Sequence, residues 1–210
     1  GAYSVNDKIT IGGITYNVTG GYNVTAINTT LTGEITIPET VFDGQDVTFT
    51  VTGVGFDESP QAWSGVTAVN LPSTLKTINR GAFFGSSITR IHIPASVKEI
   101  SSLGLTYGMS KLAEITVDES NPYFKSVDNV LYSKDGKELV AYPRSRPLDE
   151  ENVFRIPEGV EVVRGMAFNS ISALKTLYVP KTVLTYNAVS TCTNLENVFV
   201  DDDNPNYCDV

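Results

Sequence analysis

The stretch that decides the fold is ITRIHIPASVKEI, residues 88–100. Its first half alternates apolar and polar side chains, which is the pattern of a strand with one buried face. Pro94 ends that strand because proline has no amide hydrogen to donate to a neighbouring strand. Val97 and Ile100 follow at spacings of three residues, which favours a tight turn rather than a sheet. The stretch therefore predicts a strand, a proline stop and a turn.

The same order of residues recurs along the chain at a nearly constant spacing. The proline position is filled in turn by Pro38, Pro72, Pro94, Asp118, Pro157, Pro180 and Asp201. Four of the six intervals are 21 to 24 residues long, and a period in the low twenties is the signature of a solenoid. The interval of 39 residues after Asp118 leaves room for an insertion.

Further apolar positions repeat in register with the proline position. Three residues after it lie Leu75, Val97, Val160 and Val183, and six after it lie Ile78, Ile100, Val163 and Tyr186. An Ala-Phe pair follows in two copies, at residues 82–83 and 167–168. Such positions repeat when every coil points the same side chains into one shared core. The copy that begins at Pro94 lacks the pair, so an irregular segment is expected around residues 103–109.

The chain is expected to be one continuous domain with two regions that differ in composition. Residues 1–65 are rich in Thr, Val and Ile, with Gly and Asn between them, which predicts short strands that form a β-rich N-terminal cap. Residues 66–210 are expected to form the solenoid, whose end needs such a cap to cover its apolar face. An inserted β-hairpin is predicted at about residues 121–143, around an Asp-Gly turn. Trp63 is expected to fill the junction between cap and coils.

Composition places the chain among soluble globular proteins and argues against several partners. Of its 210 residues, 41% are hydrophobic and 19% are charged, which is ordinary for such proteins. The net charge of −9 argues against nucleic acid and anionic membranes, since both select basic surfaces. No apolar run approaches the ~18 residues that span a bilayer, so no membrane insertion is expected. Any secretion signal is expected to have been removed.

These residues resemble the BspA-like leucine-rich-repeat family. The resemblance is carried by the pattern L-x-x-I-x-I-P-x-x-V-x-x-I-x-x-x-A-F, to which residues 75–83 and 158–168 are close matches. The insert SVDNVLYSKDGKELVAYP, residues 126–143, is similar to that family's recurrent hairpin. The resemblance implies a β-rich, α/β-type right-handed solenoid with one parallel strand per coil. It also implies a secreted or surface-anchored bacterial protein, such as an outer-membrane lipoprotein, used in adhesion or protein–protein contact.

Two columns of strand residues are expected to face outward, because side-chain direction alternates along a strand. One column consists of Asn70, His92, Thr116, Arg155, Tyr178 and Phe199, and the other of Ala68, Arg90, Glu114, Val153, Thr176 and Asn197. Arg90, His92 and Arg155 are expected to cluster toward the middle, with Tyr178 and Phe199 together near the end. Aromatic and basic side chains exposed on a sheet suit a protein or glycan partner. These five residues are therefore the predicted binding site.

The sequence is equally compatible with a purely structural role for the two aromatic residues. Tyr178 and Phe199 would then stabilise the sheet across neighbouring strands, covered by the inserted hairpin.

No catalytic, cofactor or metal site is predicted. His92 is the only histidine, and nucleophilic catalysis would need a serine or cysteine beside it. Cys192 fills an inward small-residue position and is expected to be a core thiol, whereas Cys208 is expected to be exposed. Residues 201–203, three consecutive aspartates, could bind calcium. Their counterpart at residues 118–121 favours instead a turn in which Asp and Asn bond their own backbone.

The sequence therefore predicts a non-enzymatic interaction module at the cell surface or outside the cell, with a protein or host-matrix component as its main partner. Two alternatives stay open. One is a glycan-binding protein that works beside degrading enzymes, and the other is a structural spacer that holds another domain away from the cell surface.

Overall fold

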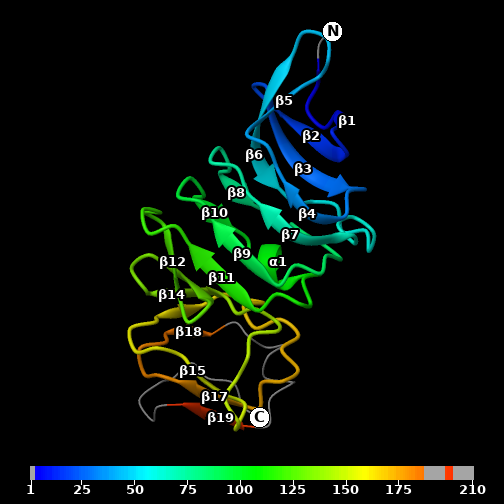
Figure 1. The fold of residues 1–210 in the computed structure, drawn as a ribbon. Helices are drawn as coiled ribbons and strands as arrows, with labels where there is room; N and C mark the ends of the chain where they lie inside the picture. The colour runs from blue at the N-terminus through cyan, green and yellow to red at the C-terminus, as the bar shows by residue number, and fades with distance from the viewer. Residues whose placement is uncertain (1–2, 187–196, 201–210) are drawn as a thin grey trace.

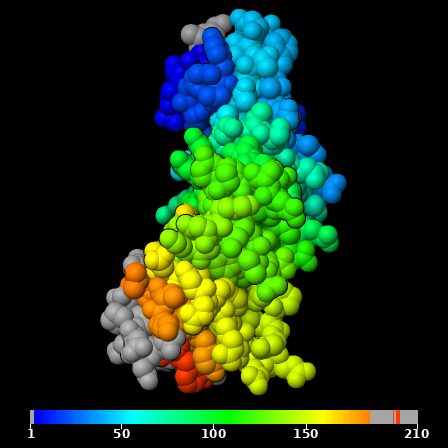
Figure 2. All heavy atoms as spheres, turned by 90° about the vertical axis from the view of Figure 1, so that its left-hand side faces the viewer, coloured from blue at the N-terminus to red at the C-terminus, as the bar shows by residue number. Residues whose placement is uncertain are grey.

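The computed structural model describes residues 3–186 and 197–200. Its coils stack along one axis into an elongated molecule, with the first strands at one end and the last strands at the other (Figure 1). Figure 2 shows the same succession in a space-filling view, in which the coils coloured green form the broad middle. The β-rich solenoid that the sequence predicted is confirmed.

Each coil contributes one strand that ends at or just before the proline position. In the first half of the chain these strands are β4 (Gly33–Thr36), β7 (Val66–Asn70), β9 (Arg90–Ile93) and β11 (Glu114–Val117). In the second half they are β15 (Val153–Arg155), β17 (Thr176–Val179) and β19 (Asn197–Val200). The pairs are parallel: β4 with β7, β9 with β11, and β17 with both β15 and β19. We call these strands the main strand column.

In the coils of Pro72, Pro94, Pro157 and Pro180, a second, shorter strand lies about six residues beyond the proline. These strands are β8 (Thr77–Ile78), β10 (Glu99–Ile100), β16 (Val162–Val163) and β18 (Thr185–Tyr186). The expectation that this half of the coil is only a tight turn is wrong for β10, which pairs in parallel with β8. Backbone amides just outside that pair continue the ladder, because Lys98 donates to Lys76 and Ser101 donates to Ile78. Two residues therefore suffice for a strand when the preceding coil supplies partners.

The β-rich N-terminal cap continues this second row of strands. β1 (Lys8–Ile11), β2 (Ile14–Gly20) and β3 (Asn23–Thr29) form an antiparallel meander, and β6 (Thr48–Val54) lies parallel between β3 and β8. β5 (Thr40–Phe42) pairs with β6 in the antiparallel sense. Trp63 is fully buried at the junction with the first regular coil. Its indole donates to the Ile27 carbonyl at 3.1 Å, and its ring meets Phe83 edge-on.

The insertion contributes three antiparallel strands, one more than the predicted hairpin, and the last of them pairs in parallel with β16. Its strands are β12 (Phe124–Val127), β13 (Val130–Ser133) and β14 (Glu138–Ala141), and we call them the hairpin sheet. The predicted Asp-Gly turn joins the last two, with Gly136 at φ +76° and the Asp135 carboxylate accepting from the Ser133 hydroxyl. Asp128 and Asn129 join the first two, both at positive φ as a type I′ turn requires.

The hairpin sheet separates two hydrophobic cores. One face points Leu131 and Val140 into the core of the first coils, and the other points Val130 and Leu139 into the core of the last coils. All four side chains are fully buried, which is why the insertion is apolar on both faces. The main strand column is interrupted here, since β11 lies beside β12 and β13. We call β1–β11 the N-terminal stack and β15–β19 the C-terminal stack.

A short helix, α1 (Ser102–Thr106), occupies the coil that lacks the Ala-Phe pair. It buries Leu105 in the core of the N-terminal stack and lies beside β14. The irregular segment expected around residues 103–109 is therefore a single helical turn. Within the part of the chain that the structure describes, no helix has the length and apolar content needed to cross a bilayer.

Candidate interaction surface on the C-terminal stack

Strand register brings three outward side chains of the C-terminal stack into one row. Arg155 of β15 pairs with Tyr178 of β17, which pairs in turn with Phe199 of β19. The residues beside them, such as Phe154 and Leu177, point the opposite way and are buried in the core. Because side chains alternate along a strand, the inward pattern fixes which three residues face out.

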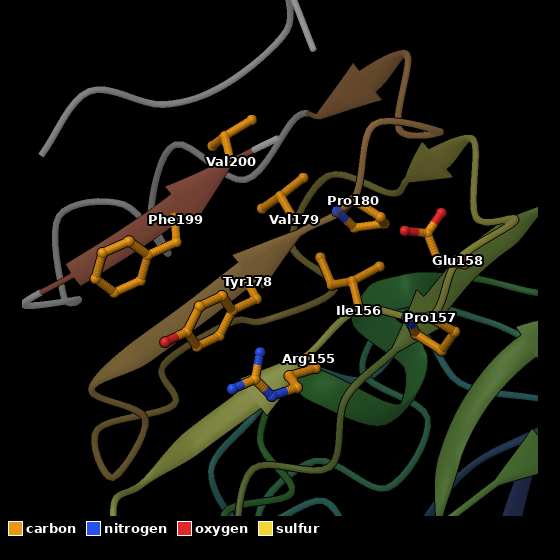
Figure 3. A pocket seen from close by; sticks show the side chains of 9 residues that line it. All are labelled: Arg155, Ile156, Pro157, Glu158, Tyr178, Val179, Pro180, Phe199 and Val200. Carbon is orange, nitrogen blue, oxygen red and sulfur yellow. The ribbon is translucent and has the colours of Figure 1, made fainter. Parts of the chain in front are cut away.

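The three side chains lie one over the next, and the two aromatic rings are nearly parallel. The guanidinium carbon of Arg155 lies 3.9 Å from the centroid of the Tyr178 ring. The Tyr178 and Phe199 rings stack at 4.9 Å between centroids, with an interplanar angle of 19°. Figure 3 shows the row running across the three strands. We call Arg155, Tyr178 and Phe199 the stacked ladder.

Phe199 gives the ladder exposed aromatic surface. It is 50% exposed, Tyr178 is half-buried and Arg155 is exposed. The hairpin sheet does not cover these side chains, because its two faces are occupied by the two cores. The cross-strand stacking that the structural interpretation expected is therefore present, whereas the expected cover is absent from the residues that the structure describes.

A groove of about 500 Å³ runs along the ladder. Ile156, Val179 and Val200 line it, the first two as nearly buried residues of the core, and Pro157 and Pro180 line it as well (Figure 3). Both prolines are the ones that end the strands, so the repeat itself places them beside the outward residues. The sequence interpretation named the ladder but missed these lining residues, although the proline spacing could have indicated them.

The charges of the groove are separated along its length. Among the described residues, no carboxylate forms an ion pair with the Arg155 guanidinium. Glu158 also lines the groove, and Figure 3 shows it beyond Pro157, away from the stacked rings. The Arg155 cation lies over the face of the Tyr178 ring, in a cation–π contact, rather than against a carboxylate.

The other two predicted site residues lie elsewhere. Arg90 and His92 are both exposed on β9, in the N-terminal stack. His92 Nδ1 is 2.9 Å from the Thr116 hydroxyl on the neighbouring strand. It lines a second groove of about 550 Å³, which it shares with Asp118 but not with the ladder. The expected cluster of Arg90, His92 and Arg155 is wrong, because the hairpin sheet lies between their strands and Arg155 joins the aromatic residues instead.

The groove at His92 contains the residue types of a catalytic triad without its geometry. Ser96 lines the same groove, but its hydroxyl oxygen is buried and has no hydrogen-bond partner. The Asp118 carboxylate accepts from the hydroxyl and the amide of Ser120, which lower its pKa, the hydroxyl more strongly. His92 is engaged with Thr116 on the neighbouring strand. Although the three residues line one groove, no hydrogen bond joins Ser96, His92 and Asp118 to one another.

The turn interpretation of residues 118–121 agrees with these contacts. Asn121 is buried, and its side-chain oxygen accepts from the amides of Tyr123 and Phe124. Among the described residues, no group of three or more acidic, histidine or cysteine side chains is placed to hold a metal ion. Cys192, Cys208 and the three aspartates at 201–203 lie outside the described residues.

Comparison with known proteins gives a family and a fold. The family model described as "BspA type Leucine rich repeat region" matches in six copies over residues 61–134 and 150–207. No curated protein matches the chain at a significant level.

Two solved structures are similar in fold. A leucine rich cell surface protein from Faecalibacterium prausnitzii A2-165 has a TM-score of 0.54 and 19% identity, over 94% of this chain and 77% of that one. A leucine-rich repeat protein from Eubacterium ventriosum ATCC 27560 has a TM-score of 0.52 and 18% identity, over 90% of this chain and 70% of that one. At these identities the likeness concerns the fold alone.

Proposed function

Because the chain belongs to the BspA-type leucine-rich-repeat family, we propose that it is a non-enzymatic module that binds a protein partner, at the cell surface or after secretion. Stacked repeats of this kind offer extended surfaces for binding other proteins. The name of the Faecalibacterium protein places that relative at a cell surface, which supports the proposed location for this chain.

The stacked ladder is the observation that carries the proposal. Tyrosine and arginine are enriched among the residues that dominate protein–protein binding energy, and here both stand beside a half-exposed Phe199. The outward positions of the coils do not need an aromatic residue to maintain the fold, since the N-terminal stack has Asn70, His92 and Thr116 there. The groove adds apolar side chains next to the ladder, which suits the apolar centre and polar rim of a protein interface.

The alternative of a glycan partner is less well supported by the geometry. Sugars stack on open aromatic faces, but Arg155 and Phe199 cover the two faces of Tyr178, which leaves Phe199 as the one ring of the ladder that a sugar could stack on. The alternative of a structural spacer does not require the exposed Phe199 or its groove.

The test is a binding screen of the purified chain against extracellular-matrix proteins, with a glycan array in parallel. Wild type is expected to bind one or more proteins, and Phe199→Ala to lose about ten-fold or more in affinity, because exposed aromatic anchors dominate interfaces. Phe42→Ala is the matched control, since Phe42 is 53% exposed on β5 at the other end of the molecule. Binding of glycans alone, or protein binding that Phe199→Ala leaves unchanged, would contradict the proposal.

A further inference from the structure

The stacked ladder presents its edges to solvent. Arg155 and Phe199 lie on the two strands that flank Tyr178, so both faces of the central ring are covered. What the ladder still offers a partner is a rim, formed by the edge of Tyr178 and the N–H groups of Arg155, together with the exposed part of Phe199.

The rim of such a ladder favours a negative charge. An aromatic ring has a negative face and a positive edge, and a guanidinium directs its N–H donors outward within its own plane. The cation–π contact with Tyr178 gives the Arg155 guanidinium no hydrogen-bond acceptor, so its fork of donors stays available. Among the described residues no carboxylate pairs with that fork. A carboxylate from a partner would complete it with two parallel hydrogen bonds.

The groove beside the rim favours an apolar group next to that carboxylate. Ile156, Val179 and Val200 line it together with the exposed Phe199. Its volume of about 500 Å³ is within the range of ~300–1,000 Å³ of small-ligand sites. A peptide combines a carboxylate and an apolar side chain on neighbouring residues, which matches the two halves of the site.

We propose that this groove binds an acidic peptide segment of the partner protein, in which an Asp or Glu carboxylate pairs with Arg155 and an adjacent apolar side chain packs against Phe199. This inference rests on the proposed function and gives the chemistry of the partner. Arg155 is then the residue that determines specificity, and Phe199 is the apolar anchor.

Glu158 restricts where the acidic residue can lie. It lines the groove beyond Pro157, away from the rings (Figure 3), so a second partner carboxylate near it would be repelled. The chain as a whole carries a net charge of −9, which disfavours acidic partners over most of its surface. Selectivity would therefore come from the Arg155 end of the groove, with repulsion elsewhere acting against misplaced partners.

The test starts from an unbiased library of displayed peptides, selected on the full chain. The best selected peptide is then synthesised together with a counterpart in which each Asp or Glu is replaced by its amide. Affinities of both peptides are measured by fluorescence polarisation for wild type, Arg155→Gln, Phe199→Leu and Arg90→Gln. Arg90→Gln is the matched control, because Arg90 is an exposed arginine of the main strand column outside the groove. Circular dichroism verifies that the variants are folded.

The expected result is a preference that depends on Arg155. Selected peptides should be enriched in Asp or Glu beside an apolar residue, and wild type should bind the acidic peptide at least about ten-fold more tightly than the amide counterpart, as hydrogen bonds to charged groups allow. In Arg155→Gln the two peptides should bind equally, whereas Arg90→Gln should keep the wild-type preference. Glu158→Gln should tighten binding of peptides with two acidic residues.

Other outcomes distinguish a failure of the acidic-peptide inference from a failure of the proposed protein-binding function. Peptides that lose affinity in Phe199→Leu but show no acidic preference would overturn this inference and leave the groove as a protein-binding site. Peptides whose affinity no groove variant changes, or binding of acidic glycans in place of peptides, would overturn the inference and the proposed function together.

Discussion

The N-terminal and C-terminal stacks both have apolar inward residues, but their outward residues differ in chemistry. At matching register positions, β7, β9 and β11 present Asn70, His92 and Thr116, while the C-terminal strands present the stacked ladder. The described inward side chains of these strands are apolar in both stacks, such as Ile91 and Ile115 in one and Phe154 and Leu177 in the other. The buried positions therefore maintain the coil, and the outward positions are free to differ. A surface that differs where the fold does not require it is where recognition is expected.

The hairpin sheet connects the two stacks and makes their comparison testable. It shares its side chains between the two cores, so a change in one core is expected to affect the other. Several hydrogen bonds also cross the junction, for example from the Asn169 amide to the Thr106 carbonyl at 2.9 Å. The stacks differ in outward chemistry, but they are expected to unfold together.

The largest effect is expected from the aromatic residue of the Ala-Phe pair in each stack. Phe83 packs on Trp63 in the N-terminal stack, and Phe168 packs on Tyr142 and Phe154 in the C-terminal stack. Both are essentially fully buried, so Phe83→Ala and Phe168→Ala should each lower the free energy of unfolding by about 3–5 kcal/mol. Urea unfolding measured by circular dichroism would give these values.

Trp63 fluorescence tells whether the stacks are coupled, because it is the only tryptophan and it lies in the N-terminal stack. Phe168→Ala is expected to shift the fluorescence and circular dichroism transitions equally. A shift in circular dichroism with an unchanged Trp63 transition would show that the stacks unfold separately, and the hairpin sheet would then be a spacer rather than a coupling layer.

A smaller effect is expected from Arg164, which connects the C-terminal stack to the N-terminal one. Its Nε contacts Glu138 Oε1 at 2.6 Å, and its Nη1 donates to the Ile100 carbonyl of β10 at 2.5 Å. Arg164→Met keeps the aliphatic stem but leaves both acceptors without this donor, so the free energy of unfolding should fall by about 1–3 kcal/mol. Chemical denaturation measures the change.

The control for Arg164 is the exposed pair of Lys137 and Glu161, whose charged atoms are 3.8 Å apart. Lys137→Met should change the free energy of unfolding by less than about 1 kcal/mol, since exposed ion pairs contribute little. Equal effects of the two substitutions would mean that the link through Ile100 adds nothing to the junction.

The outward residues should affect stability still less than the junction. Phe199→Ala removes one stacked ring pair and should lower the free energy of unfolding by about 0.5–1.5 kcal/mol. His92→Ala, at the corresponding position of the N-terminal stack, should change it by no more than about 0.5 kcal/mol, as surface substitutions usually do. Thermal unfolding of both variants tests this. If Phe199→Ala lowered the free energy of unfolding by more than about 3 kcal/mol, the main role of the stacked ladder would be to stabilise the fold.

The sequence predicts the coil well because each coil repeats the same physical constraint. Alternation before Pro94 and Pro180 identified the main strands, and the intervals of 23 and 21 residues placed Tyr178 beside Arg155 and Phe199 on the neighbouring coils. The two-residue strands such as β10 were missed because their pairing depends on the adjacent coil rather than on local pattern. Periodicity detects the strands that the residues of a single coil specify. It does not detect strands that form only because the neighbouring coil supplies hydrogen-bond partners.

The sequence predicted the grouping of Tyr178 and Phe199 after the insertion, but it wrongly grouped Arg155 with the residues before the insertion. Residue counting aligned Arg90 and His92 with Arg155 as members of one surface, but it does not tell whether an insertion projects outward or lies between coils. The hairpin sheet lies between them because both of its faces are apolar, as in Leu131 and Val130. That two-sided burial was visible in the sequence as a run without alternation, and it was the available signal for the break.

The smallest expected effect concerns pH and is confined to the N-terminal stack. The Asp43 carboxylate accepts from the Tyr3 hydroxyl at 2.6 Å and from the backbone amides of Gln45 and Val47. These bonds, that from Tyr3 foremost, lower the pKa of Asp43 well below its usual range. In the unfolded chain the pKa returns to about 3.9. The stabilisation is therefore complete above that pH and is lost as the pH falls toward the lower pKa of the folded state.

Asp43→Asn should therefore make the dependence of the melting temperature on pH less steep below about pH 4, while Tyr3→Phe should have an intermediate effect because the amide bonds remain. Some dependence should persist, since hydrogen bonds also lower the pKa of Asp118 and Asp135. Circular dichroism melts between about pH 2 and pH 5 would measure the slope. If Asp43→Asn melts with the wild-type slope, the acid sensitivity of the N-terminal stack comes from carboxylates other than Asp43, because an asparagine cannot release a proton in this range.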